Sequence, residues 1–272
     1  YRRFRNTLRY LLGALDGYDQ VEQVGYDDMP DLEKWVLHRI ATLDDRIRRM
    51  TETYDFHGIF TELYQFCNSD LSAFYFEIRK DMLYCDLPAS TGRRACRTVM
   101  HELLNRLTAW LAPIICFTAE EAWQAYVGDP ENSVHLRQYD AVPANWRNDD
   151  IDADWSTIRQ VRQVVMSALE KARNDGAIGA SLQAALRVYV TPAMQSAFDG
   201  QDVASLFITS AATIVTDTPP ADAFRLDTVA EVAVRFAVAE GGKCARCWKV
   251  MPEVTTDNVI CKRCIDVVAK LA

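Results

Sequence analysis

The chain has 272 residues, of which 49% are hydrophobic and 25% are charged, and its formal net charge is −8. This composition contains enough apolar residues to form a packed core and excludes a largely disordered protein. The length is sufficient for two domains. No run of about eighteen apolar residues occurs, so the sequence predicts no membrane-spanning helix. The negative charge also argues against nonspecific nucleic-acid binding over the whole surface.

The first part of the chain carries apolar stripes at helical spacing. One stripe runs through residues 31–54, a second through 55–79, and a third follows Ser90, which we predict to be its N-cap. The segment Thr118–Glu121 has the residue types of a capping box and predicts the start of a short helix. Four or five amphipathic helices joined by short loops indicate a helix bundle.

The pattern changes after residues 127–150, a polar segment rich in Asn, Pro and acids that marks a domain boundary. A helical stripe returns over 152–175, and β-branched or alternating runs then predict strands. The strand candidates are 184–190, 230–239 and two shorter runs within 205–215. We therefore expect a mainly α protein with three parts: a helical domain (1–150), an α+β domain (151–241) and a zinc-binding knuckle (242–272).

The eight cysteines fall into two groups. Cys244, Cys247, Cys261 and Cys264 form the pattern C-x2-C-x13-C-x2-C, which is typical of a structural zinc site without an open position for water. An iron–sulfur site and a redox dithiol are alternatives, although neither usually needs two such pairs. The remaining cysteines lie singly in helical stretches, so we expect buried thiols in a reducing cytoplasm. They are Cys67, Cys85, Cys96 and Cys116.

Basic residues gather at both ends of this acidic chain. Those of the knuckle are Lys243, Arg246, Lys249, Lys262 and Arg263. They either offset the negative charge of a zinc ion with four thiolates, or bind phosphates beside Trp248, whose ring would stack on an unpaired base. Near the start, Arg2, Arg5 and Arg9 share one helix face, which is either a solvated face or a row of RNA phosphate contacts.

We identify no catalytic centre in the sequence. The four histidines lie apart, and we expect them to be structural. Paired carboxylates such as Glu120–Glu121 are typical of solvated faces or helix caps. The glycine-containing segment 175–180 ends a helix and lacks the lysine of a phosphate-binding loop.

Five segments resemble bacterial isoleucyl-tRNA synthetase, in the order that this family shows downstream of its catalytic core. The first half resembles the helical anticodon-binding domain that valyl- and leucyl-tRNA synthetases share, and the terminal knuckle points to the isoleucine enzyme. The segments are YRRFRNTLRYLLG (1–13), YDFHGIF (54–60), DLSAFYFEIRKDMLYCD (70–86), RRACRTVMHELLNRLTAWLAPIICFTAEEAW (93–123) and KCARCWK with CKRC (243–264). Residues 179–190 also resemble the family's junction segment.

The resemblance implies a helix bundle of the class I synthetase anticodon-binding type. It implies one structural Zn²⁺ on the four clustered cysteines, and tRNA(Ile), bound through its anticodon stem-loop, as partner. The family attaches isoleucine to tRNA with ATP. The HIGH-type and KMSKS-type motifs and the editing domain are missing from this sequence, so we expect an inactive, tRNA-recognising portion that docks on a catalytic domain of the same polypeptide. Trp35 and Trp123 are candidates for exposed docking residues.

Two other classes share part of this pattern. DNA glycosylases of the formamidopyrimidine type carry a similar finger, but they need an N-terminal Pro-Glu that this sequence lacks. A protein-interaction module could use zinc only to stabilise its tail. Salt-dependent affinity for the anticodon stem-loop would separate this last interpretation from RNA recognition.

Overall fold

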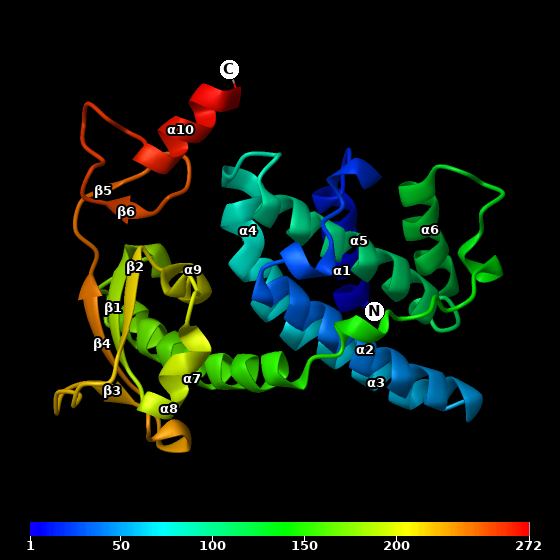
Figure 1. Ribbon diagram of the computed structural model, residues 1–272, viewed down its shortest axis with the longest axis horizontal. Coiled ribbons are helices and arrows are strands. Elements are labelled where there is room, and N and C mark those ends of the chain that lie inside the picture. Colours follow the sequence, from blue (N-terminus) through cyan, green and yellow to red (C-terminus); the bar gives the residue numbers. More distant parts are fainter. Residues whose placement is uncertain (272) are drawn as a thin grey trace. The chain divides into compact units, whose positions relative to one another are not determined.

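The computed structural model describes residues 1–271 and divides the chain into two compact units. Unit 1 comprises residues 1–84 and 88–149, and unit 2 comprises residues 85–87 and the chain from 150 onward. Unit 1 is built of helices, whereas unit 2 combines helices with two small sheets (Figure 1). The predicted fold class is thus confirmed, while the predicted separation of 151–241 from 242–272 stays a prediction.

Unit 1 is a helix bundle with short connections. The predicted stripe over 31–54 corresponds to one long helix with a buried apolar face. Ser90 is the N-cap that the sequence predicted, and its hydroxyl accepts a hydrogen bond from the Arg93 N–H at 3.4 Å. The helices are α1 (Arg2–Ala14), α2 (Asp31–Glu52), α3 (Phe56–Gln65), α4 (Phe76–Cys85), α5 (Thr91–Leu111) and α6 (Cys116–Val127).

The predicted capping box at Thr118–Glu121 is wrong, because α6 already begins at Cys116. The hydroxyl of Thr118 donates to the Tyr1 hydroxyl at 3.2 Å instead of capping a helix. Glu121, the other member of the predicted box, pairs with Arg5 of α1 at 3.8 Å. Tertiary partners have therefore taken the groups that the local pattern assigned to a cap.

A π-helical segment, Phe66–Tyr75, joins α3 to α4 without a break. Its polar side chains bind the neighbouring helices: Asp70 accepts from Arg39 Nε of α2 at 3.1 Å, and Ser72 accepts from Arg3 Nη1 of α1 at 3.0 Å. The sequence stripe over 55–79 indicates one helix but not this wider turn. Single π turns are the usual form, so a run of this length is unusual.

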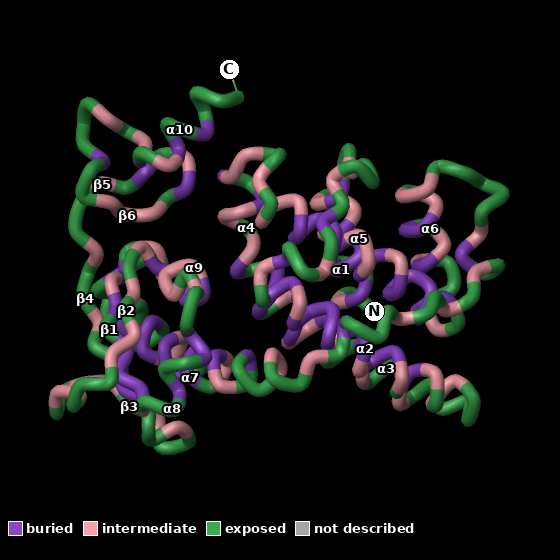
Figure 2. The backbone as a smooth tube through the Cα atoms, viewed as in Figure 1, coloured by how far each residue is buried: buried purple, intermediate pink, exposed green. Residues whose placement is uncertain are grey.

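Apolar side chains from all the long helices form the core of unit 1, and Figure 2 colours the buried residues along each helix purple. Trp35 is 1% exposed and Trp123 is 6% exposed, so the expectation that they form an exposed docking surface is wrong. The Trp123 ring NH donates to the Asn132 carbonyl at 2.8 Å, and the Arg137 guanidinium lies 4.0 Å from a ring centroid of this indole. The segment after α6 thus covers Trp123.

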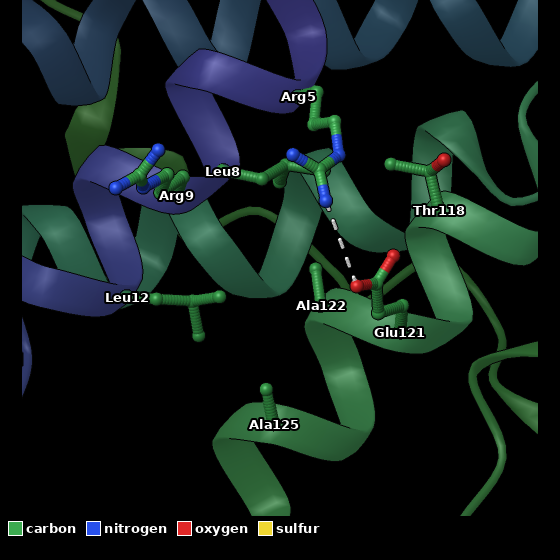
Figure 3. Close-up of a pocket in the computed structure, with 8 residues that line it drawn as sticks. All are labelled: Arg5, Leu8, Arg9, Leu12, Thr118, Glu121, Ala122 and Ala125. Atoms are coloured by element: carbon green, nitrogen blue, oxygen red, sulfur yellow. Dashed lines mark ion pairs between the residues drawn. The ribbon is translucent and has the colours of Figure 1, made fainter.

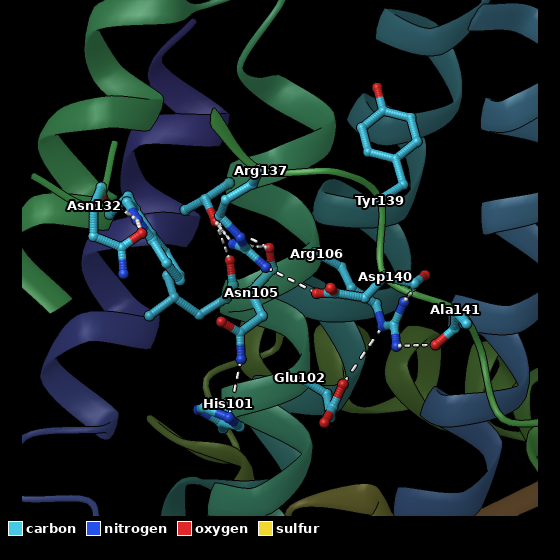
Figure 4. A network of polar contacts seen from close by, with 12 residues as sticks. His101, Glu102, Asn105, Arg106, Asn132, Arg137, Tyr139, Asp140 and Ala141 are labelled. Carbon is cyan, nitrogen blue, oxygen red and sulfur yellow. Dashed lines mark hydrogen bonds and ion pairs between the residues drawn. The ribbon is translucent and has the colours of Figure 1, made fainter. Parts of the chain in front are cut away.

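Two arginines hold that segment against α5 (Figure 4). Arg137 donates to the Asn105 carbonyl at 2.9 Å and pairs with Asp140. Arg106 of α5 donates to the carbonyls of Asp140 and Ala141 at 3.2 and 3.3 Å. Because each arginine satisfies backbone carbonyls with several donors, the polar sequence after α6 folds as a fixed part of unit 1.

Unit 2 contains a four-stranded sheet of order β2-β1-β4-β3, in which β1 pairs with β2 in parallel and with β4 antiparallel. The predicted strand within 205–210 is wrong, because Asp202 caps a short helix there by accepting from the Ser205 N–H. The elements are α7 (Asp149–Asn174), β1 (Ala184–Tyr189), α8 (Pro192–Gln195), α9 (Val203–Phe207), β2 (Ala211–Val215), β3 (Phe224–Arg225), β4 (Ala233–Val238), β5 (Gly242–Lys243), β6 (Val250–Met251) and α10 (Lys262–Leu271).

The side chains of unit 2 divide between a core and an open sheet face. Leu186, Val188 and Val234 are at most 4% exposed, as are Trp155 and Ile158 on α7. The alternate strand positions project to the other face, as the two-residue period of a strand requires. Within residues 1–271, no helix combines the length and apolar character needed to cross a membrane.

Candidate metal centre and nucleic-acid interface

The four clustered cysteines meet at one point of unit 2. The sulfur atoms of Cys244, Cys247, Cys261 and Cys264 all lie within 4.8 Å of one another, and each residue is buried. Cys247 Sγ and Cys261 Sγ are 3.7 Å apart. A tetrahedral zinc ion with Zn–S bonds of about 2.3 Å separates its sulfurs by about 3.8 Å, so this donor set fits a zinc ion and leaves no position for water.

A two-stranded hairpin carries the first pair of cysteines. Strand β5 pairs with β6, and the N–H of Cys244 donates to the Lys249 carbonyl at 2.9 Å. Gly241 has a φ of 113°, and a side chain there would meet the Met251 carbonyl oxygen. The glycine before the first cysteine pair is therefore required by the close approach of the two strands.

The second pair lies where α10 begins, and the backbone directs N–H groups at the sulfurs. The Cys261 N–H donates to Cys244 Sγ at 3.3 Å. Burial disfavours the thiolate of Cys244, but N–H groups from Cys247, Cys261 and Arg246 outweigh that effect and lower its pKa to about 6. A sulfur that accepts several N–H bonds is suited to the deprotonated state that a metal requires.

Trp248 lies on the surface of the knuckle. Its side chain is 61% exposed, and its φ of 67° places the residue in the left-handed region that non-glycine residues rarely occupy. Its N–H donates to the Cys244 carbonyl at 3.0 Å, which closes the turn between the two thiols. The Lys243 ammonium lies 5.4 Å from the ring centroid. The turn thus presents an aromatic face and a positive charge side by side.

The other lysines of the knuckle differ in their surroundings. Lys262 is exposed at the start of α10. Lys249 is half-buried, and its ammonium lies 3.4 Å from the hydroxyl of Ser205 in α9. The neighbouring Val250 N–H donates to the Ser210 hydroxyl at 2.7 Å. These two bonds fix β6 to the segment that carries α9 and β2.

Two arginines of the knuckle bind the short segment 85–87, which belongs to the same unit. Arg246 donates to the Cys85 carbonyl and lies 3.8 Å from Cys264 Sγ, and Arg263 pairs with Asp86 at 3.4 Å. Cys85 itself is buried against the four clustered cysteines. From the sequence, Cys85 is expected to be an isolated core thiol, and its spacing from the other cysteines does not indicate this position.

The arginine row of α1 lies beside a shallow cavity of about 140 Å³ between α1 and α6 (Figure 3). Arg2, Arg5 and Arg9 are exposed on one face of α1, as predicted from their spacing. Arg5 pairs with Glu121 at 3.8 Å, whereas Arg9 lines the cavity with no ion pair to any residue in 1–271. An exposed ion pair such as Arg5–Glu121 stabilises the protein little, so Arg5 can exchange Glu121 for another anion.

Three of the four scattered cysteines are buried as expected: Cys67, Cys85 and Cys96. Cys116 is exposed, and for this residue the expectation of a buried thiol is wrong. It occupies the first position of α6, where the helix starts at the surface. The apolar neighbours of Cys116 in the sequence did not indicate that.

Comparisons with known proteins show the family of the helical part of the chain. A family described as "Anticodon-binding domain of tRNA ligase" matches residues 33–190, more than half of the chain. The chain belongs to this family of anticodon-binding domains. Family membership gives no support to the DNA glycosylase interpretation.

The chain is also similar to part of larger enzymes named isoleucine–tRNA ligase. Isoleucine–tRNA ligase of Agrobacterium fabrum (strain C58 / ATCC 33970) is 48% identical over 258 residues, which are 94% of this chain and 26% of that protein. The Gluconobacter oxydans (strain 621H) ligase is 46% identical over 272 residues, 99% of this chain and 27% of that protein. The chain therefore spans about a quarter of the length of the curated relatives it matches.

Proposed function

We propose that the chain is the carboxyl-terminal, tRNA-recognising portion of an isoleucine–tRNA ligase, and that it holds the anticodon stem-loop of tRNA(Ile). The ATP-dependent attachment of isoleucine then belongs to catalytic and editing domains outside these residues, on which this portion docks. The family membership and the ligase relatives support the proposal. Free thiols remain reduced in a reducing compartment, so we propose that the enzyme is cytoplasmic.

The observation that carries the proposal is the exposed indole of Trp248 beside four cysteines that are arranged as metal ligands. If Trp248 served only to pack the knuckle, its ring would be buried, yet 61% of Trp248 is exposed. Stacking on aromatic rings is the common way in which proteins hold unpaired bases of an RNA loop. The Lys243 ammonium, 5.4 Å from the ring, adds a positive charge where a phosphate would lie.

Zinc would be held by Cys244, Cys247, Cys261 and Cys264 and would act structurally. Because four cysteine sulfurs complete the coordination, the ion would activate no water. The metal would supply folding energy to the hairpin and to the start of α10, which contain little apolar core of their own. The orientation of Trp248 would then depend on the metal.

The basic residues of the proposal fall into two groups. Lys243 and Lys262 are exposed and would contact phosphates directly. Arg246, Lys249 and Arg263 bind other groups of unit 2 and would act on RNA mainly by positioning the knuckle. On α1, the row Arg2, Arg5 and Arg9 would form a second set of phosphate contacts.

The test is a titration of an isoleucine-type anticodon stem-loop into the zinc-loaded chain. We expect Trp248→Ala to lose about 1–3 kcal/mol of binding free energy, the contribution of one stacked base. A zinc-stripped sample should lose at least as much. Phe117→Ala is the matched control for the knuckle, because Phe117 is an aromatic residue of unit 1 that is 92% exposed and lies outside the knuckle.

Equal affinity of all four samples would overturn the role of the knuckle in RNA recognition. The zinc would then only stabilise the tail, and the basic residues would offset its thiolates. Absence of any salt-dependent binding by the intact chain would overturn the proposed function as a whole.

A further inference from the structure

The open face of the sheet in unit 2 carries two arginines that oppose each other. In the register of the strands, Arg187 of β1 lies directly opposite Arg235 of β4, and Thr213 of β2 lies on the other side of Arg187. Both arginines are exposed, whereas Leu186 and Val234 beside them are at most 4% exposed. The two guanidinium groups therefore belong to the solvent face of the sheet.

The next row of this face is made of small side chains. Ala185 lies between Ala211 and Ala237 in the register, so three alanines from three adjacent strands lie side by side. They line a shallow cavity of about 470 Å³ together with Arg187 and Arg235. Small residues leave the backbone of the sheet open to a close approach by an extended molecule.

The opposed arginines are electrostatically unfavourable when nothing is bound. Like charges directly across a strand pair destabilise a sheet. Arg187 is partly balanced by an ion pair with Asp217 at 2.5 Å and by the ring of Tyr189. Arg235 has no ion pair with any residue in 1–271. An anion bound between the two side chains would remove the repulsion.

This positive face contrasts with its surroundings. Residues 176–241 contain three arginines and seven acidic side chains, and two of the three arginines are Arg187 and Arg235. Because the surrounding segments repel anions, a polyanion that approaches this part of unit 2 is directed to the open sheet face.

The cavity also adjoins the knuckle. The alanine row lies at the end of the sheet from which β4 leads, after Val238, into β5 (Figure 1). Two lining residues, Ala204 and Ala211, are the direct neighbours of Ser205 and Ser210, which bind Lys249 and the Val250 N–H. A strand of RNA held by the knuckle would therefore continue onto the sheet without leaving unit 2.

We propose that the open face of this sheet binds the sugar-phosphate backbone of RNA, with a phosphate between Arg187 and Arg235 and the backbone passing over the three alanines. This inference rests on the proposed function and extends it from the knuckle to the sheet. The contact is insensitive to base identity, because phosphates position an RNA without reporting its sequence. The Thr213 hydroxyl supplies a further hydrogen bond to the same backbone.

The test is the salt dependence of stem-loop affinity for the 272-residue, zinc-loaded chain. Affinity falls as salt rises, and removing one phosphate contact should make this dependence shallower, by about 0.7 in the slope of log affinity against log salt. We expect this loss for Arg235→Gln, with affinity about three- to ten-fold weaker at low salt. Arg235→Lys should retain the slope, because a lysine also neutralises a phosphate. Arg225→Gln on β3 is the control for the loss of one charge elsewhere in the unit.

The outcomes separate the two proposals. If Arg235→Gln binds with unchanged slope while Trp248→Ala is weakened, the sheet inference is overturned and the proposed function stands. If Arg225→Gln lowers the slope as much as Arg235→Gln, only net charge matters and the site on the sheet is overturned. If the unaltered chain binds no stem-loop, the proposed function fails first. The thermal unfolding temperature of Arg235→Gln should be unchanged or higher, since like-charge repulsion is removed.

Discussion

Glu33 of α2 and Arg79 of α4 form a bidentate ion pair inside unit 1. Arg79 Nε and Nη2 donate to the two carboxylate oxygens at 2.7 and 2.5 Å, and the Glu33 side chain is 0% exposed. The Tyr75 hydroxyl donates to the same carboxylate at 3.1 Å. Three donors thus satisfy both oxygens of the buried carboxylate, and the pair fixes the position of α4 on α2.

We predict that breaking this pair on one side destabilises unit 1 strongly. Arg79→Met leaves the Glu33 charge buried without its partner, which should cost about 3–5 kcal/mol of unfolding free energy. The double variant Glu33→Met, Arg79→Met removes both charges and should recover most of that loss. Urea unfolding monitored by far-ultraviolet circular dichroism, which is dominated by helices, measures both values. A double variant as unstable as Arg79→Met would contradict the electrostatic explanation.

Thiol labelling should report metal binding. In the zinc-loaded chain we expect Cys116 alone to react quickly with iodoacetamide, because it is exposed whereas the other seven cysteines are buried. Burial raises the pKa of Cys67 and of Cys96 to about 12, which keeps these thiols protonated and unreactive. Removal of zinc by a chelator should add the four knuckle cysteines to the labelled set. Mass spectrometry of the labelled peptides counts them, and labelling that a chelator leaves unchanged would argue against the metal site.

Trp248 should be a residue that lowers the stability of the knuckle. Its φ of 67° costs a non-glycine residue about 1–2 kcal/mol, which glycine does not incur. We therefore expect Trp248→Gly to hold zinc at least as tightly as the unaltered chain while losing stem-loop affinity. Competition with a chromophoric chelator measures the first quantity. Weaker zinc binding by Trp248→Gly would instead make the indole a structural part of the knuckle.

Gly241 should be far less tolerant of substitution than another glycine of unit 2. Gly241→Ala combines a φ of 113° with a clash against the Met251 carbonyl, so β5 and β6 must separate and zinc affinity should fall at least ten-fold. Gly179→Ala is the matched control, since its added methyl would lie 3.6 Å from the nearest side-chain atom. Equal zinc affinity of the two variants would show that the hairpin adapts.

The helices of unit 1 and the metal site could be predicted from the sequence because each rests on a local signal. The stripe over 31–54 predicts α2, and the spacing of Cys244, Cys247, Cys261 and Cys264 predicts their meeting point. Ser90 is a cap because its hydroxyl reaches an N–H three residues away. These signals depend on neighbours in the chain, and at these positions no tertiary contact overrides them.

One error came from a local helix cap that we overlooked, and the others arose where tertiary contacts decide. The run at 205–210 is as apolar as a strand, but α9 forms there because Asp202 caps it and Ile208 ends it at a φ of 57°. Trp123 is covered by Asn132 and Arg137, which lie beyond the helix that carries it. The opposition of Arg187 and Arg235 follows only from strand register, which no local pattern specifies.

The π-helical segment Phe66–Tyr75 makes the number of residues in this helix as important as their identity. A π turn holds more residues than an α turn, so deleting one residue here would let the segment tighten and would rotate everything that follows by about 100°. Arg79 would then leave Glu33, and the apolar residues of α4 would face solvent. Related sequences that keep this bundle should therefore tolerate changes of side chain between α3 and α4 far better than a gap of one residue.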